Sequence, residues 1–299
     1  MVRTKGDLCG LTVRTEAEYG IVNASGTSAY AGTTLTLTDR SEKTEEGIGQ
    51  CGSRVDADTM VISTSTGYSA TFNHVRDQGW EEWIVRAIGA LTGVQRELPS
   101  FDTAIRIDPS TVHLWTGCRV DTLGISAASP GAKLEFSVGT VARWHTKTPF
   151  QDSDGDTITM DTVPIPTGIP ITFNRPWEYS TNGTTFTKIP AKAFNLSISN
   201  ALASDPGISD EDGTGYGLEA GEGSAAQDCT ITLDLTITSK DNTWDDLRMA
   251  LTKGMTFRTV IDGHTVTLTG CSLGLAGPDR SQGQYDETIA VTALDITVV

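Results

Sequence analysis

The most constraining feature of this sequence is a strict alternation of apolar and polar residues in several short segments. In Thr230–Thr238 (TITLDLTIT) isoleucine or leucine occupies every second position, and threonine or Asp234 occupies the positions between. A period of two places alternate side chains on opposite faces of a β-strand. The same pattern in Ala193–Asn200 (AFNLSISN) and Thr33–Thr38 (TTLTLT) predicts sheets with one apolar and one polar face.

Two segments have the periodicity of an amphipathic helix instead. Around Trp80 the apolar residues recur at intervals of three and four, which predicts a helix over 79–91. Around Trp244 a shorter stripe of the same kind predicts a helix over 243–253. Each helix opens with a tryptophan and two acidic residues, and acids suit the positive end of the helix dipole.

The predicted elements occur twice in the same order, and the phrase Thr116-Gly117-Cys118 returns as Thr269-Gly270-Cys271. Each series holds a strand, a long acidic loop, a strand, a helix and three strands, of which the middle one contains Thr-Gly-Cys. In the first series the elements other than the helix cover 33–38, 39–59, 60–73, 101–107, 111–125 and 133–144, and in the second 193–200, 201–228, 229–238, 255–261, 264–275 and 285–297. We interpret the repeat as an internal duplication, which predicts a mainly β chain of two tandem domains, each with one flanking helix.

The expected boundaries are 1–148 for the first domain, 149–190 for a connector and 191–299 for the second domain. The connector is rich in proline, glycine, aspartate and threonine. Its Asn182-Gly183 pair is the favoured sequence for a tight hairpin turn, so a hairpin is expected there.

The charge balance excludes one function class. The chain has 22 lysines and arginines against 38 aspartates and glutamates, a formal net charge of −16, so affinity for nucleic acid through phosphate neutralisation is not expected.

The five cysteines are widely spaced without a CxxC pair, which favours neither a zinc site nor a disulfide framework and suits a reducing place of synthesis. The N-terminal segment lacks the apolar core of a secretory signal, and the sequence contains no apolar run of membrane-spanning length.

Three motifs invite a chemical interpretation, and each has a simpler one. His113 and His264 lie near the Thr-Gly-Cys phrases at unequal distances, so buried structural cysteines are favoured over a Cys-His nucleophile pair. The GxGxxG match at 47–52 follows an acidic segment and precedes no helical pattern, whereas a dinucleotide site needs a buried strand before the motif and a helix after it. A loop is therefore favoured. Asp152–Asp156 resembles the start of a calcium loop, but Thr157 and Val163 stand where such a loop has its glycine and glutamate, so the segment is interpreted as a surface turn. No catalytic residue, metal or cofactor is predicted.

The two acidic loops, 39–59 and 201–228, are longer than loops usually are in compact domains. Because they occur at the same place in both series, we expect them to contact neighbouring subunits. The acidic residues assigned to these contacts are Glu45, Glu46, Asp210, Glu211, Asp212, Glu219 and Glu222.

Several stretches carry a resemblance to a known family: the opening Glu16–Gly20, a helix that ends in Ala87-Ile88-Gly89, the segment TGCRVDTLGISAASPGAKLEFSV at 116–138, and FNLSISNAL at 194–202. In these stretches the chain resembles the phage tail tube proteins, the major tail proteins of siphovirus-like phages. The resemblance implies β-sandwich domains with a flanking helix, which form rings of sixfold or pseudo-sixfold symmetry. Such rings stack into a tube that conducts DNA through an acidic lumen, and long loops make contacts between rings.

With two domains in one chain, three chains are expected to close such a ring, and a ring of six chains is the alternative. The residues expected to line the lumen come from the polar faces of the second domain: Asn195, Ser197, Ser199, Thr232, Asp234 and Thr236.

The partners that the resemblance implies are further copies of the chain, other tail proteins (tape measure, terminator, and baseplate or tip proteins), and viral DNA passing without specific binding. The protein is expected in the virion tail, assembled in the host cytoplasm, with no membrane contact and no enzymatic activity. Two rival interpretations stay open. A secreted adhesin or pilus module calls for a signal peptide and usually paired cysteines, and a β-sandwich hydrolase calls for paired carboxylates or a triad.

Overall fold

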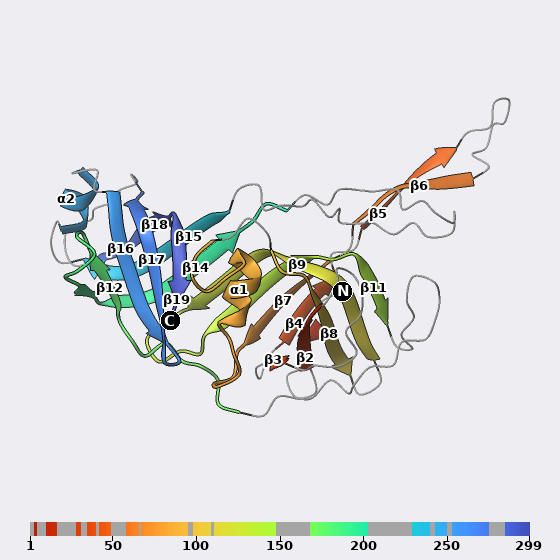
Figure 1. The fold of residues 1–299 in the computed structure, drawn as a ribbon, viewed down its shortest axis with the longest axis horizontal. Coiled ribbons are helices and arrows are strands. Elements are labelled where there is room, and N and C mark those ends of the chain that lie inside the picture. Colours follow the sequence, from red (N-terminus) through yellow and green to blue (C-terminus); the bar gives the residue numbers. More distant parts are fainter. Residues whose placement is uncertain are drawn as a thin grey trace.

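The computed structural model of the chain describes residues 3–4, 10–16, 28–30, 35–39, 42–48, 58–65, 67–94, 98–108, 111–147, 168–202, 229–239, 243–249, 253–274 and 285–299. Within these ranges the strands pair antiparallel (Figure 1). The part of the chain up to residue 147 contributes eleven strands and one helix: β1 (Arg3–Thr4), β2 (Gly10–Thr15), β3 (Ser28–Tyr30), β4 (Leu35–Asp39), β5 (Glu42–Ile48), β6 (Asp58–Ser65), β7 (Tyr68–Asn73), α1 (Glu82–Ile88), β8 (Phe101–Asp108), β9 (Thr111–Ala127), β10 (Glu135–Val141) and β11 (Trp144–Lys147).

The part from residue 168 onward contributes eight strands and the second helix: β12 (Trp177–Ser180), β13 (Thr187–Ile189), β14 (Ala191–Ser199), β15 (Thr230–Ser239), α2 (Thr243–Met249), β16 (Lys253–Ile261), β17 (His264–Leu273), β18 (Tyr285–Ala293) and β19 (Asp295–Val298). We call β4, β7, α1 and β8–β11 the first unit, and β14, β15, α2 and β16–β19 the second unit.

One run of neighbouring strands crosses both units in the order β4, β7, β10, β9, β14, β15, β18 and β17. The first four strands belong to the first unit and the last four to the second. The N-terminal half of β9 continues into a second layer with β8, β2, β3 and β11, and β17 likewise joins β16 and β19. In each unit one long strand therefore takes part in both layers.

The two long strands change layer at the repeated Thr-Gly-Cys phrase. Gly117 and Gly270 have positive φ angles of 62° and 65°, a conformation that glycine adopts without steric cost. In both units two residues of the long strand face one residue of its neighbour, which is a β-bulge. The flanking pairs correspond between units: Cys118–Phe101 and Trp115–Thr103 in the first, Cys271–Met255 and Leu268–Phe257 in the second.

The space between the two layers of each unit is filled by large apolar side chains. In the first unit Tyr68 of β7 lies 5.0 Å from Trp115 of β9, measured between ring centroids, and its hydroxyl is 2.9 Å from that of Thr103 on β8. Next to the second unit, Trp177 of β12 contacts Phe194 of β14 with 5.6 Å between ring centroids. All of these rings but that of Phe194 are less than 2% exposed. The described part of the chain is thus mainly β, as the alternation predicts, and it contains two short helices.

Most predicted elements are present, with three changes. The strands expected at 60–73, 133–144 and 285–297 are each two strands, β6 and β7, β10 and β11, and β18 and β19. The helices are shorter than 79–91 and 243–253. The prediction of a loop over 39–59 is wrong for its described residues, because β5 and β6 pair as a hairpin that extends away from both units (Figure 1). The hairpin expected at Asn182-Gly183 is confirmed as β12 and β13, and β12 also pairs with β16.

Candidate functional site

The six predicted lumen residues lie together on one side of the β14–β15 pair. Asn195 is directly opposite Asp234, Ser197 is opposite Thr232, and Thr236 is opposite Ala193. The residues between them on both strands are buried, which places the six polar side chains on the opposite face. The alternation therefore identified a real polar face, which we call the polar face.

The polar face continues across neighbouring strands that the sequence analysis did not include. Ser126 on β9 is opposite both Asn195 on β14 and Glu135 on β10, and Ser137 on β10 is opposite Thr71 on β7. On the other side of β15, Thr292 of β18 is opposite Thr232. The members outside β14 and β15 are mostly small and polar: Ser69, Thr71, Thr122, Gly124, Ser126, Glu135, Ser137, Thr288, Ala290 and Thr292. For the members on β9 and β10, the alternation of apolar and polar residues in 122–127 and 135–138 was the sequence signal that could have identified them.

The charged groups on this face are mainly acidic. Glu135 and Asp234 carry carboxylates, and Asp286 of β18 adds a third next to Thr238. Lys192 of β14 reaches the same place, where its ammonium lies 2.6 Å from the Asp286 carboxylate. Hydrogen bonds from Lys192 and Thr238 hold the pKa of Asp286 below its usual value. The lysine is thus paired with an acid on the face itself.

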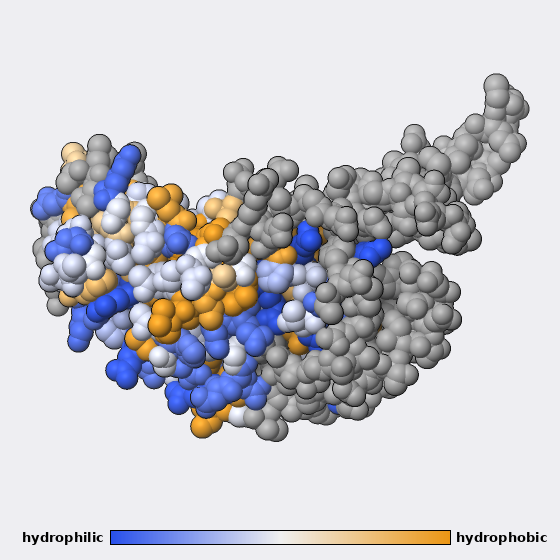
Figure 2. All heavy atoms as spheres, viewed as in Figure 1, coloured by the Kyte–Doolittle hydropathy of each residue, from blue (hydrophilic) through white to orange (hydrophobic). Residues whose placement is uncertain are grey.

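The opposite side of the same strands forms the continuous core. Ile125, Phe136, Leu196, Leu233 and Val291 are each at most 1% exposed. Helix α1 belongs to this side, where Trp83 contacts Phe72 at 5.6 Å between ring centroids. Viewed from the α1 side, the surface shows apolar atoms gathered near α1 and the C-terminal strands, between hydrophilic ones (Figure 2).

The two units are joined strand to strand. Strands β9 and β14 form six consecutive antiparallel pairs, from Phe194–Ala127 to Ser199–Thr122. At the end of this ladder Asn200 is fully buried, and its amide donates hydrogen bonds to the carbonyls of Ala87 and Val120. This β9–β14 ladder, which we call the joint, therefore connects the strands of the two units with the end of α1.

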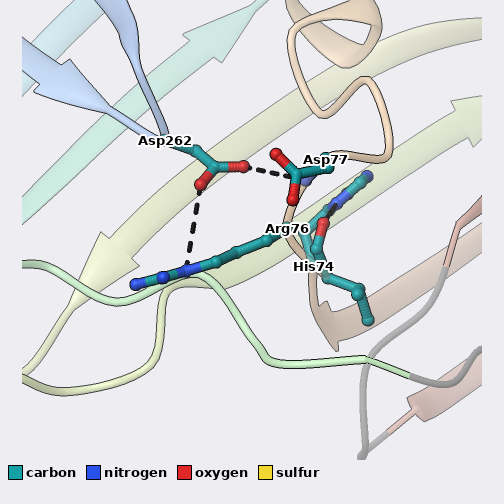
Figure 3. Close-up of polar contacts among 5 residues, drawn as sticks. His74, Arg76, Asp77 and Asp262 are labelled. Atoms are coloured by element: carbon teal, nitrogen blue, oxygen red, sulfur yellow. Dashed lines mark hydrogen bonds and ion pairs between the residues drawn. The ribbon is translucent and has the colours of Figure 1, made fainter.

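Residues before and after α1 also contact the second unit, outside the β9–β14 ladder. Asp262, in the turn between β16 and β17, accepts a hydrogen bond from the Asp77 backbone N–H at 3.0 Å and lies 3.9 Å from the Arg76 guanidinium (Figure 3). After α1, the Asp295 carboxylate of β19 accepts a hydrogen bond from the Val94 N–H at 2.8 Å. The first unit thus contacts the second unit through main-chain and side-chain groups on both sides of α1.

His74, just before this segment, is fully buried against aromatic rings. Its Nδ1 donates to the Val75 carbonyl at 2.8 Å. Burial lowers the pKa of His74 to about 4, since the charged form would lose its hydration. The ring is therefore neutral near pH 7 and acts as part of the core.

The other chemical candidates have structural positions. Cys118 and Cys271 are buried, and burial raises the pKa of the Cys271 thiol to about 12 and that of Cys118 well above its ordinary value. His113 contacts His145 on β11, with 2.9 Å between ring nitrogens. The expectation that these two cysteines are buried is confirmed. Gly47 of the GxGxxG match lies in β5, and the next described element is β6.

The acidic residues predicted to contact neighbouring subunits are described only in part. Glu45 and Glu46 lie on β5, opposite Val61 and Met60, whereas Asp210, Glu211, Asp212, Glu219, Glu222 and Asp152–Asp156 lie outside the described residues. Among the residues that are described, no group of three or more metal-ligating side chains occurs. No helix within the described ranges is long and apolar enough to span a membrane.

The comparison with protein families decides between the interpretations left open by the sequence. The family model of the phage tail tube proteins matches residues 6–296, nearly the whole chain. The chain belongs to the phage tail tube protein family. This tail tube protein is a structural component of the virion tail. A comparison with curated proteins gave no match. The adhesin and hydrolase interpretations are not supported by the family assignment.

Proposed function

We propose that this tail tube protein forms rings whose inner wall is the polar face, and that viral DNA passes along this wall without binding to it. The observation that carries the proposal is the continuity of the polar face over six strands of both units. Serine, threonine and glycine offer no fixed cation to phosphate, and Glu135 and Asp234 repel it. Lys192 is already paired with Asp286, so its charge is balanced locally.

We further infer that three chains close each ring. The β9–β14 joint connects the two units of one chain, and the units share the same element order and the same bulge. If a strand-to-strand joint of this kind recurs between chains, the end of β17 in one chain lies beside β1 of the next, because β1 already pairs with the outer edge of β4. Six units around the ring then give threefold symmetry with a pseudo-sixfold arrangement of units, because head-to-tail contacts leave no free edge once the rotation closes. A ring of six chains is the alternative.

The β5–β6 hairpin suits contacts between stacked rings. It extends away from both units, and Glu45 and Glu46 lie on its first strand (Figure 1). An exposed hairpin offers unpaired backbone groups to a neighbour. We assign it, together with the acidic segment 201–228, to contacts with adjacent subunits or rings. The tape measure, terminator and tip proteins of the tail are the expected partners at the ends of the tube.

Cations introduced on the polar face test DNA conduction. Replacement of Thr232 or Asp234 by arginine should leave tubes assembled but slow DNA release from phage particles, because each ring would carry additional phosphate-binding charges. The measurement is the rate of DNA release triggered in vitro. A matched control is Thr187→Arg on the exposed β13 strand, which should release DNA at the wild-type rate. Equal release rates for Thr232→Arg, Asp234→Arg and the wild type would contradict the proposal.

A further inference from the structure

A single lysine stands among the strands that carry the polar face. Over their described ranges β7, β10, β14, β15 and β18, together with residues 122–127 of β9, contain no arginine and one lysine, Lys192 of β14. A cation on a wall that faces DNA can replace the counterions of phosphate and so bind it. The way in which the chain holds this ammonium group therefore bears on the passage of DNA.

The backbone places Lys192 at an irregular point of the sheet. Ala191 is opposite Ile237 and Ala193 is opposite Thr236, so Lys192 is the extra residue of a β-bulge. The Ala191 side chain is buried, whereas Lys192 is exposed. The bulge thus directs the lysine out of the core at the end of β14.

From this point the lysine side chain reaches across β15 to the next strand. Its ammonium donates a hydrogen bond to Oδ1 of Asp286 at 2.6 Å, and Asp286 lies on β18, on the other side of β15. Two strand spacings separate β14 from β18, roughly 10 Å. Thr238 of β15 lies between them and donates to the same oxygen at 3.0 Å. The lysine therefore lies along the sheet instead of projecting from it.

This ion pair is too exposed to matter much for folding. The side chains of Lys192 and Asp286 are 51% and 55% exposed, and pairs in contact with water contribute little to the free energy of unfolding. Its larger effect is on the position and balance of charge. Without the carboxylate, the three N–H donors of the ammonium would be available to a passing phosphate.

We propose that Asp286, assisted by Thr238, is a positioning residue for DNA passage: it holds Lys192 against the wall and cancels its charge, so that the lysine does not bind phosphate. This inference rests on the proposed function, in which the polar face lines the lumen. It assigns to Asp286 a task that the general acidity of the face does not perform, because a repelling carboxylate elsewhere leaves the ammonium group free to move.

Removal of the carboxylate tests the assignment. Phage particles with Asp286→Thr should release DNA at least about tenfold more slowly than wild type at low salt, and the difference should shrink as the salt concentration rises, because phosphate contacts weaken with salt. Threonine suits a strand, so tube formation and the thermal midpoint of the protein should stay at their wild-type values. Asp286→Asn is the second variant and should also slow release.

The partner is tested by adding Lys192→Gln to Asp286→Thr, which should restore the wild-type release rate. The matched control is Glu178→Gln. It breaks a similar pair, in which the Arg258 guanidinium lies 2.8 Å from the Glu178 carboxylate, but on β12 and β16, outside the strands of the polar face. This control should release DNA at the wild-type rate at every salt concentration.

Wild-type release by both Asp286 variants, or slow release that Lys192→Gln does not relieve, would overturn the role of Asp286. The proposed function would still stand in either case if Asp234→Arg slows release. If neither Asp234→Arg nor Asp286→Thr slows it, both the assignment and the proposed lumen face are wrong.

Discussion

At the residue scale, Gly117 and Gly270 determine where β9 and β17 pass from one layer to the other. Both have a positive φ. The Gly117 N–H also donates to the buried Glu16 carboxylate at 2.6 Å, which fixes the bulge from the neighbouring β2 side. A Cβ atom at Gly270 would lie 2.8–2.9 Å from three atoms of Leu294. The repeated Thr-Gly-Cys phrase therefore has a backbone reason: the glycine permits the bend, and the cysteine packs beneath it.

Substitution of these glycines should destabilise the fold. Gly117→Ala should lower the free energy of unfolding by about 1–2 kcal/mol, the usual cost of a left-handed conformation for a residue with a Cβ. Gly270→Ala should cost more, because Leu294 must also move. Urea unfolding measures both, with Gly124→Ala as the control, since its Cβ would meet Ser137 at an ordinary 3.6 Å. Equal stability of all three variants would refute this account of the bulges.

His74 makes stability depend on pH in a defined window. Its pKa is about 4 in the folded protein and near 6.5 in the unfolded chain, so the unfolded state takes up the proton first. Protonation of His74 therefore leaves the free energy of unfolding unchanged above pH 6.5 and lowers it by about 3 kcal/mol in total as the pH falls to 4. The measurement is the difference in unfolding free energy between wild type and His74→Gln at pH 7 and 4. A difference that does not shrink toward pH 4 would show that His74 is not buried neutral.

At the element scale, the sequence was informative wherever one face of a strand is buried. The alternation in 193–200 and 230–238 predicted β14 and β15 and assigned their faces, because burial on one side requires a period of two. It failed for β5, where Glu42–Ile48 is too acidic to show an apolar face. It also missed the break between β6 and β7. There Gly67 allows close approach to the Thr140 carbonyl, which a Cβ at residue 67 would meet at 2.2 Å, a contact that no local pattern reveals.

The pairing of β9 with β14 could not be predicted from the sequence either. Each strand was expected, but their register joins residues about seventy positions apart, and periodicity carries no information about which strands are neighbours. As a result, the polar face was predicted for two strands and found over six. The duplication and the domain boundaries remain predictions, supported by the equal order of elements and by the matching bulges.

At the scale of the whole molecule, the central claim is that the joint inside one chain is the pattern for the joint between chains. Cryo-electron microscopy of assembled tubes tests this most directly. The account predicts three chains in each ring, with six units around a lumen lined by the polar face and with the end of β17 of each chain beside β1 of the next. A ring of six chains, or a ring in which the polar face points away from the lumen, would contradict it.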